Sequence, residues 1–271
     1  MPELPEVETY RRYFEETSLH QPIEFIEVED RKLLTTDYAT LTETLVGQSF
    51  VSTKRVGKNL FVQTKRGNIV HFHFGMTGDL EYYHSSLDRP RHARIIFGFR
   101  SGFNLGFICP RKFERIGLVE NRESYLKSKK IAPDALEISL EELRHNLRKR
   151  KSWIKPVLLD QSTVAGIGNW IVDEVLFQAK IHPERWTQSL TEEETAAIFK
   201  AMRYVLETAI EHEARYGRFP ASFLIHAREW DVSPYEEANR HLVCPCGQAE
   251  IAQIRVGGRA TYFCPQCQSA E

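Results

Sequence analysis

The first half of the chain carries one helical pattern followed by several strand-like patterns. Residues 3–17 predict a helix, because Pro5 suits a first helical turn and the acids Glu6 and Glu8 favour a helix N-terminus. From about residue 22 to residue 120 the pattern changes to short β-rich runs, several with period two and with Gly, Asn and Asp between them: 25–28, 60–63, 69–74 and 94–99. This half therefore predicts an antiparallel sandwich or barrel behind a leading helix.

The second half is helical from about residue 131 onward. Ser139 with Glu142, and Thr191 with Glu194, form capping-box patterns that open two helices, of which the second runs to about residue 214. Between these helices, residues 158–170 predict an apolar helix, a Gly-containing turn and a second helix.

The pattern becomes irregular after the long helix. Residues 216–240 mix Pro, Gly, aromatic and charged positions and indicate a loop, and a cysteine-containing module closes the chain. We therefore expect an α+β protein of several domains. These are an N-terminal β-sandwich with its leading helix over 1–130, a helical domain over 131–240 and a small hairpin module over 241–271.

Composition and charge narrow the possible partners. No run of 18 apolar residues predicts a membrane span, and MPELPEVETY lacks the basic start and apolar core of a secretory signal, so we expect a cytoplasmic protein with no membrane partner. The formal net charge is -1, yet basic residues gather in 89–115 and in 144–155. These groups fit one basic face for nucleic acid, and they fit two ordinary solvated surfaces equally well.

Four of the five cysteines lie in the last 28 residues of the chain. Two short pairs separated by 17 residues suit one tetrahedral zinc ion with four thiolate ligands, and the sequence between the pairs predicts a strand–Gly-Gly–strand hairpin. The first pair is C-x-C rather than the usual C-x-x-C, and unligated thiols in a disordered tail are the alternative. The predicted ligands of one structural zinc are Cys244, Cys246, Cys264 and Cys267.

The N-terminus offers a second candidate site. Removal of Met1 before the small residue Pro2 would expose a secondary amine whose pKa is lower than that of lysine, so it can attack an electrophilic carbon and form a Schiff base. Glu3 stands beside it as a candidate acid or base. Taken alone, this stretch is more often just a helix start.

Motifs along most of the chain strengthen that second interpretation. MPELPEVETYRR resembles the N-terminus of the formamidopyrimidine-DNA glycosylase and endonuclease VIII family, and favours the formamidopyrimidine branch. Five further segments resemble family motifs in family order. They are the lysine motif at 56–60, the methionine loop at 73–78, the Pro-Arg-x-Phe element at 110–113, the helix–two-turn–helix motif at 154–185 and the zinc-finger tip at 259–261.

The resemblance implies a role for each matching residue. Pro2 corresponds to the nucleophile that attacks C1′ of the damaged nucleotide, Glu3 to the group that protonates the sugar, and Lys58 to the lysine of the elimination steps. The side chains that fill the gap left by a flipped base would be Met76, Arg111 and Phe113. Contacts to the DNA backbone would come from His92, Arg150, Lys155, Asn169 and Arg259, of which Arg259 is also expected to serve the catalytic site.

Each of these residues also has a purely structural alternative. Met76 and Phe113 would most simply be core residues, Lys58 an ordinary surface lysine and Asn169 a helix cap. Their joint occurrence in family order favours the functional interpretation.

The implied reaction is excision of an oxidised or ring-opened base from double-stranded DNA through an imine on Pro2, followed by β- and δ-elimination that nicks the strand. A monomer acting at the bacterial nucleoid is expected, without an obligate protein partner. The alternatives are a damage-recognising protein of the same fold that has lost catalysis, and a zinc nuclease, for which we find no His/Asp metal cluster.

One segment departs from the family pattern. Where 8-oxoguanine-specific members carry a Gly-rich lid, residues 216–230 are rich in apolar side chains, which predicts a stiffer and more apolar cover over the flipped base. We therefore expect ring-opened purines, abasic sites or oxidised pyrimidines to be processed faster than 8-oxoguanine.

Overall fold

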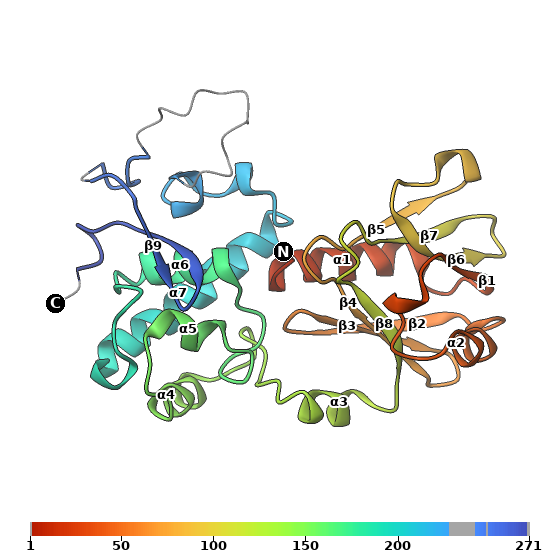
Figure 1. Cartoon of the computed structure of the whole chain (residues 1–271), viewed down its shortest axis with the longest axis horizontal. Coiled ribbons are helices and arrows are strands. Elements are labelled where there is room, and N and C mark those ends of the chain that lie inside the picture. Colours follow the sequence, from red (N-terminus) through yellow and green to blue (C-terminus); the bar gives the residue numbers. More distant parts are fainter. Residues whose placement is uncertain (1, 228–241, 248, 270–271) are drawn as a thin grey trace. The chain divides into compact units, whose positions relative to one another are not determined.

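The computed structural model describes residues 2–227, 242–247 and 249–269, and it divides the chain into two compact units, Met1–Lys130 and Ile131–Glu271 (Figure 1). The helical region and the cysteine hairpin lie in the same unit. The expected division into three domains stays a prediction. Among the described residues, no helix combines the length and the apolar character needed to cross a membrane.

Two four-stranded antiparallel sheets form the N-terminal unit, as the sequence pattern predicted. One sheet has the order β1-β6-β7-β5 and the other β2-β3-β4-β8. The four predicted runs fall in β1, β3, β4 and β6. The strands are β1 Ile23–Val28, β2 Phe50–Val56, β3 Asn59–Thr64, β4 Ile69–His73, β5 Asp79–Tyr83, β6 Ala93–Phe99, β7 Asn104–Ile108 and β8 Arg115–Val119.

Helix α1 (Leu4–Ser18) packs against strands of both sheets, chiefly β2 and β5 (Figure 1). Its buried Val7 and Phe14 join a core of aliphatic and aromatic side chains, and Phe14 makes edge-to-face ring contacts with Phe50 and Phe72. Two shorter helices complete this unit: α2 (Tyr38–Leu45) and α3 (Arg122–Ser128).

Helix α3 places Tyr125 against the side of the second sheet that carries Phe61 and His71. His71 is buried, and its Nε2 lies 2.9 Å from Asn59 Oδ1. Burial, with smaller contributions from the charges of His73 and Lys129, lowers the pKa of His71 to about 3, so the ring is neutral. A neutral His71 therefore orients Asn59 at the start of β3, next to the turn that carries Lys58.

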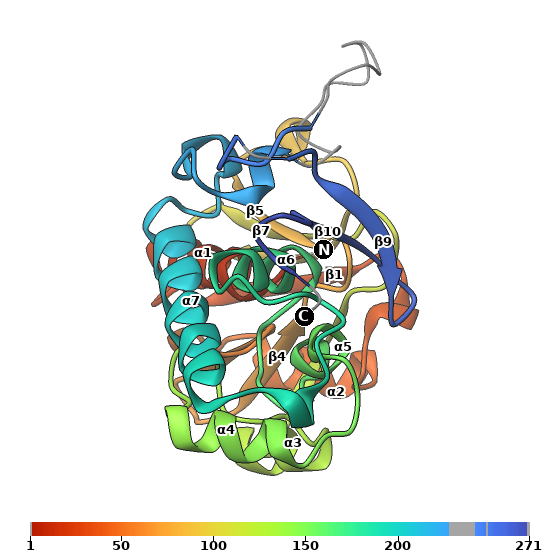
Figure 2. The same cartoon turned by 90° about the vertical axis from the view of Figure 1, so that its left-hand side faces the viewer.

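The C-terminal unit contains the predicted helices and the hairpin (Figure 2). Both predicted capping boxes are present, at Ser139 and at Thr191. The long helix ends at Glu211, slightly before the predicted end, because Glu213 and Ala214 take positive φ values of 54° and 55° that a right-handed helix cannot continue. The helices are α4 Leu140–Arg148, α5 Ile154–Leu159, α6 Asn169–Gln178 and α7 Glu192–Glu211.

Helix α6 is the centre of this unit. Every residue from Trp170 to Phe177 is buried, and α6 contacts α5, α7 and strand β10 (Arg259–Phe263). Strand β9 (Ala252–Val256) pairs with β10 through Gly257 and Gly258, both with positive φ, as the predicted Gly-Gly turn requires. A Cβ at Gly257 would lie 2.8 Å from Pro156 Cγ of α5, so the hairpin tip needs glycine to approach that helix.

The expected loop at 216–240 is partly wrong. Two short 3-10 helices, Tyr216–Arg218 and Leu224–Ala227, occupy its first part, whereas 228–241 lie outside the described residues. The reason is that Glu174 on α6 accepts the backbone N–H groups of Leu224 and Ile225, each at 3.0 Å, which fixes the turn.

Candidate functional site

Pro2 and Glu3 lie buried at the first turn of α1, where Glu3 is the N-cap residue. Glu3 and Glu6 form a capping box, in which Glu6 Oε2 accepts the N–H of Glu3 at 3.0 Å. The acids of this turn favour a helix start in the sequence, but the capping pair itself was not predicted, because Glu is not a usual N-cap residue. The pair fixes the backbone next to the candidate nucleophile.

Lys58 occupies a two-residue turn between β2 and β3. Gly57 takes a φ of +58°, and Asn59 Nδ2 donates to Val56 O at 3.2 Å across the turn. Arg55 Nη1 donates to Gly57 O at 3.2 Å, while Arg55 Nε donates to Glu8 Oε2 of α1 at 3.0 Å. Arg55 therefore connects the helix of Pro2 and Glu3 to the turn of Lys58.

Glu8 is held ionised in this connection. Burial by itself raises the pKa of Glu8, but the hydrogen bonds and positive charges of Arg11 and Arg55 outweigh burial and lower it below its usual value. The Glu8–Arg55 ion pair, with side chains only 12% and 8% exposed, is thus shielded from solvent and fixes α1 to β2.

His73 is a neighbour of Lys58 that the sequence analysis did not single out as a site residue. Its Nδ1 accepts the N–H of Gly75 at 3.2 Å. Burial lowers the pKa of His73, and the positive charges of Lys58 and Arg115 lower it further. In the sequence, the one indication of this role is that His73 is the first residue of the methionine loop at 73–78.

Met76, Arg111 and Phe113 project from two neighbouring loops of the N-terminal unit. Met76 is 36% exposed and Phe113 is 52% exposed, so neither is a core residue. The guanidinium carbon of Arg111 lies 5.4 Å from the centre of the Phe113 ring. The two loops touch, because a Cβ added to Gly75 would lie 2.7 Å from the backbone carbon of Phe113.

His92 lies just before β6 and has a φ of +67°. Its carbonyl accepts the N–H of Cys109 at 2.8 Å, just before the loop that carries Arg111.

Two of the candidate DNA contacts in the C-terminal unit are arginines. Arg150 donates to Ser162 Oγ at 2.6 Å and forms an ion pair with Asp160 at 3.0 Å. Arg259 is exposed at the start of β10.

Asn169 is the first residue of α6, whereas the N-cap is Gly168, so the simple capping alternative does not hold. Instead, Asn169 Nδ2 donates to Ala260 O of the hairpin at 3.0 Å. This bond brings the Gly166–Asn169 turn next to the hairpin strand that begins with Arg259.

The position of Lys155 does not fit the expected contact with the DNA backbone. Its side chain is 0% exposed and its Nζ lies 2.7 Å from Asp173 Oδ1 of α6. The same Nζ donates to Thr261 Oγ1 at 2.7 Å and to Ala260 O at 2.9 Å. Lys155 therefore joins α5, α6 and β10 inside the unit, an arrangement that sequence spacing alone did not reveal.

The apolar residues expected to cover a flipped base lie in the interior instead. Phe219, Phe223, Leu224 and Ile225 are each at most 5% exposed, and Phe219 and Phe223 pack ring against ring. The expected apolar cover is therefore wrong for these residues, and Trp230 lies outside the described residues.

The four C-terminal cysteines come together as the sequence predicted. One Sγ atom from each of Cys244, Cys246, Cys264 and Cys267 lies within 4.8 Å of all the others. Four thiolates at this separation fit one tetrahedral zinc ion, whose bonds to sulfur are about 2.3 Å long. The chain turns at the C-x-C pair, where Gly247 takes a φ of +70° and donates its N–H to Cys244 O at 2.7 Å. All four ligands come from protein, so this zinc is structural.

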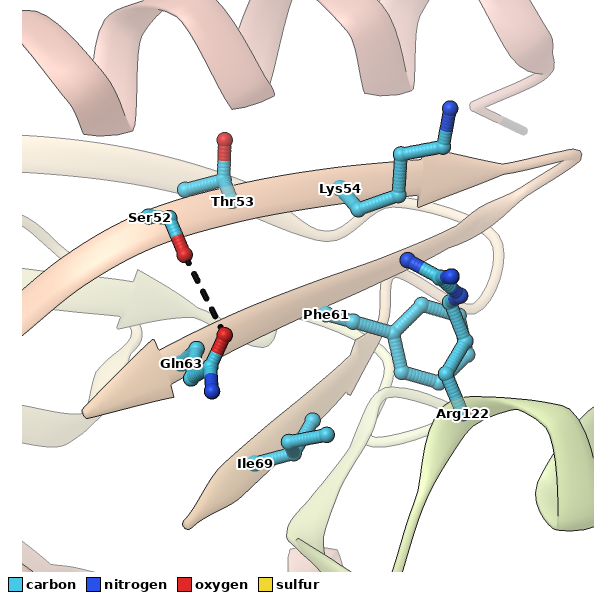
Figure 3. A pocket seen from close by; sticks show the side chains of 7 residues that line it. All are labelled: Ser52, Thr53, Lys54, Phe61, Gln63, Ile69 and Arg122. Carbon is cyan, nitrogen blue, oxygen red and sulfur yellow. Dashed lines mark hydrogen bonds between the residues drawn. The ribbon is translucent and has the colours of Figure 1, made fainter. Parts of the chain in front are cut away.

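A pocket of about 260 Å³ lies on the β2–β3–β4 face of the N-terminal unit (Figure 3). Lys54, Phe61 and Arg122 line one part of it, and the polar side chains of Ser52 and Gln63 line another. None of the predicted site residues lines this pocket, so it is separate from the candidate site.

A helix-led antiparallel sandwich, followed by a helical unit with a four-cysteine hairpin, defines a zinc-finger protein with a candidate amine nucleophile at its N-terminus. Three family descriptions match in chain order. These are the formamidopyrimidine-DNA glycosylase N-terminal domain over residues 1–116, the H2TH domain of that glycosylase over 131–219, and a zinc finger found in FPG and IleRS over 246–270. The chain therefore belongs to the formamidopyrimidine-DNA glycosylase family, and it is a glycosylase and lyase of base excision repair.

Relatives match along the whole chain. Formamidopyrimidine-DNA glycosylases of Desulforamulus reducens and Streptococcus pneumoniae are 35% and 36% identical, and the matches cover 99–100% of this chain and of each relative. The solved Lactococcus lactis enzyme bound to DNA with an abasic site is 32% identical, with a TM-score of 0.85 over 98% of this chain and 99% of that one. A structure of MutM with DNA containing carbocyclic 8-oxoguanine is 32% identical, with a TM-score of 0.87 over 99% and 100% of the two chains.

For the metal site, we expect about one zinc per purified chain and its loss in Cys264→Ala, because three thiolates no longer complete the tetrahedral site. DNA affinity should fall with the metal. Cys109→Ala is the matched control, since Cys109 is buried in the other unit and should leave the zinc content unchanged. Metal analysis by mass spectrometry decides the matter, and full zinc content in Cys264→Ala would contradict the assignment.

For Lys155, we expect Lys155→Met to lower the free energy of unfolding by about 3–5 kcal/mol, because it leaves the Asp173 carboxylate buried without the charge of Lys155. Adding Asp173→Asn should restore part of the loss. Urea unfolding measures both, with the exposed Lys151→Met as control. Unchanged stability combined with weaker DNA binding would instead support a direct contact between Lys155 and DNA.

Proposed function

We propose that the amine of Pro2, exposed once Met1 is removed, is the nucleophile of this glycosylase. The observation that carries the proposal is the fixed first turn of α1, where Pro2 and Glu3 are buried and Glu3 is locked by its capping pair with Glu6. A nucleophile at a chain terminus can react efficiently only if the backbone behind it is held in place. The capping box and the Glu8–Arg55 pair supply that restraint.

The proposed reaction begins with attack of the Pro2 nitrogen on C1′ of the damaged nucleotide. The bond from C1′ to the base breaks and the base leaves with the proton of the amine, while Glu3 protonates the sugar ring oxygen as the C1′–O4′ bond opens. The product is an iminium, the cationic imine of a secondary amine, between Pro2 and C1′. Lys58 then serves the β- and δ-eliminations that release the two phosphates and nick the strand. Its turn is tied to α1 by Arg55, which supports a role beside Pro2.

In this proposal Met76, Arg111 and Phe113 enter the gap left by the flipped nucleotide. Their exposure on two touching loops supports such a role, since apolar and guanidinium surfaces can replace part of the lost stacking. His92, Arg150, Asn169 and Arg259 are proposed to contact the backbone of double-stranded DNA. We further propose that the enzyme acts as a monomer on chromosomal DNA in the bacterial cytoplasm.

The rival function is damage recognition without catalysis by the same fold. Borohydride reduction separates the two, because only a covalent imine is trapped. We expect a stable adduct at residue 2 with DNA that contains an abasic site, and we expect none when Met1 is retained, since an amide nitrogen is not nucleophilic. An adduct mapped to Lys58 by mass spectrometry would refute the role of Pro2.

Within the same assay, Glu3→Gln should slow single-turnover base excision by about 100-fold or more, because it removes the proton donor. DNA affinity should stay nearly constant, since the side-chain shape is kept. Glu16→Gln, an exposed position on the same helix, is the matched control. Unchanged excision in Glu3→Gln would rule out the proposed role.

We expect formamidopyrimidines to be excised faster than 8-oxoguanine opposite cytosine. The interior position of Phe219, Phe223, Leu224 and Ile225 removes the argument from an apolar cover, so the expectation rests on the cost of flipping alone. Ring-opened purines stack and pair poorly and therefore cost less free energy to flip. Single-turnover rates on matched duplexes measure the preference. Fastest excision of 8-oxoguanine would show that this expectation is wrong.

A further inference from the structure

A buried carboxylate lies beneath the loops that carry Met76, Arg111 and Phe113. Glu114 follows Phe113 directly, and its side chain is 0% exposed. Glu114 Oε1 accepts a hydrogen bond from Thr77 Oγ1 at 3.2 Å, and Thr77 follows Met76 directly. One hydrogen bond between side chains thus connects the residue after Met76 to the residue after Phe113.

The backbone around this bond leaves little room for adjustment. A Cβ at Gly78 would lie 2.8 Å from Glu114 Cγ and 2.5 Å from Phe74 O, and a Cβ at Gly75 would meet the backbone of Phe113. The methionine loop is closed by a hydrogen bond of 2.8 Å from Gly78 N to Phe74 O. Glycine at both positions therefore lets the two loops pack directly on one another, with the Glu114 side chain between them.

The second carboxylate oxygen makes the arrangement unusual. Among the described residues, Glu114 Oε2 is buried and has no hydrogen-bond partner. The nearest cation in sequence, Arg115, donates instead to the backbone carbonyls of Lys112 and Glu114. The thiol of Cys109 donates its hydrogen bond to Phe107 O and not to Glu114. A buried carboxylate with an unsatisfied oxygen costs stability, and such groups call for a functional explanation.

We propose that Glu114 is a positioning residue that ties the methionine loop to the Arg111–Phe113 loop, so that the three projecting side chains enter the DNA stack as one preorganised unit. The inference rests on the proposed role of those three side chains. Without this hydrogen bond, each loop would have to be ordered separately during base flipping. The free-energy cost of that ordering would then reduce the net stabilisation of the flipped state.

The test compares two pairs of variants at the two ends of the bond. Thr77→Val removes the hydroxyl but keeps the shape, and Thr77→Ser keeps the hydroxyl. Glu114→Ala removes the acceptor, and Glu114→Gln keeps a neutral acceptor. Thr77 is exposed at the loop surface, so the valine variant should fold normally even if Glu114→Ala does not.

Each variant is assayed on two substrates. Single-turnover excision of a formamidopyrimidine from a duplex requires base flipping, whereas strand nicking at an abasic site in single-stranded DNA requires only the chemistry. We expect Thr77→Val and Glu114→Ala to slow the duplex reaction by about tenfold, the scale of one hydrogen bond to a charged group, and to leave the single-strand reaction unchanged. Thr77→Ser and Glu114→Gln should retain most of the duplex rate.

A double-variant comparison makes the test specific. On a Phe113→Ala background, which has already lost the largest projecting ring, adding Thr77→Val should cause little further loss. Equal slowing of both substrates by Thr77→Val, or full additivity with Phe113→Ala, would overturn the positioning role. If instead Met76→Ala and Phe113→Ala leave the duplex rate unchanged, the proposed function of the projecting side chains fails, and this inference fails with it.

Discussion

The packing of α1 against β2 and β5 is the constraint on which the N-terminal unit depends. Val7 and Phe14 anchor the helix in the core, and the solvent-shielded pair between Glu8 and Arg55 fixes its position along β2. A terminal amine is otherwise among the most mobile groups of a protein. Because Arg55 also bonds Gly57, the same contact that holds the helix holds the turn of Lys58. The proposed nucleophile and the proposed elimination residue thus share one support.

The C-terminal unit is organised around a different buried ion pair. Lys155 and Asp173 meet at 2.7 Å in the interior, and Lys155 also binds the backbone and side chain of β10. Asn169 adds another bond to the same strand. The hairpin is therefore attached to the helices at one end by these polar contacts and stabilised at the other by the zinc cluster. The hairpin needs a structural metal for its stability, because two five-residue strands bury too little apolar surface to fold alone.

Two of the exposed apolar side chains, Met76 and Phe113, lie where the proposed function needs them. Met76 and Phe113 are large and partly exposed, although the core a few residues away is fully buried. Exposing these apolar side chains to water costs free energy, and under the proposed function that cost is recovered when they meet a base stack. By contrast, the apolar residues of 219–225 fill the interior of their unit, so the same composition serves stability there.

Much of this protein was readable from the chain itself. Period-two runs, two capping boxes, a Gly-Gly turn and two cysteine pairs are local patterns. They correctly predicted antiparallel sheets with the strands β1, β3, β4 and β6, the helices α4 and α7, the hairpin and the zinc ligands. Family motifs named the candidate site residues, whose roles stay predictions. What a side chain meets across the fold has no local pattern. Only the tertiary structure placed Lys155 against Asp173, turned Phe223 and Leu224 inward, joined α1 to the Lys58 turn through Arg55 and buried Glu114 beneath Thr77. Each of these outcomes depends on contacts between residues distant in sequence, and such contacts form only when the elements pack.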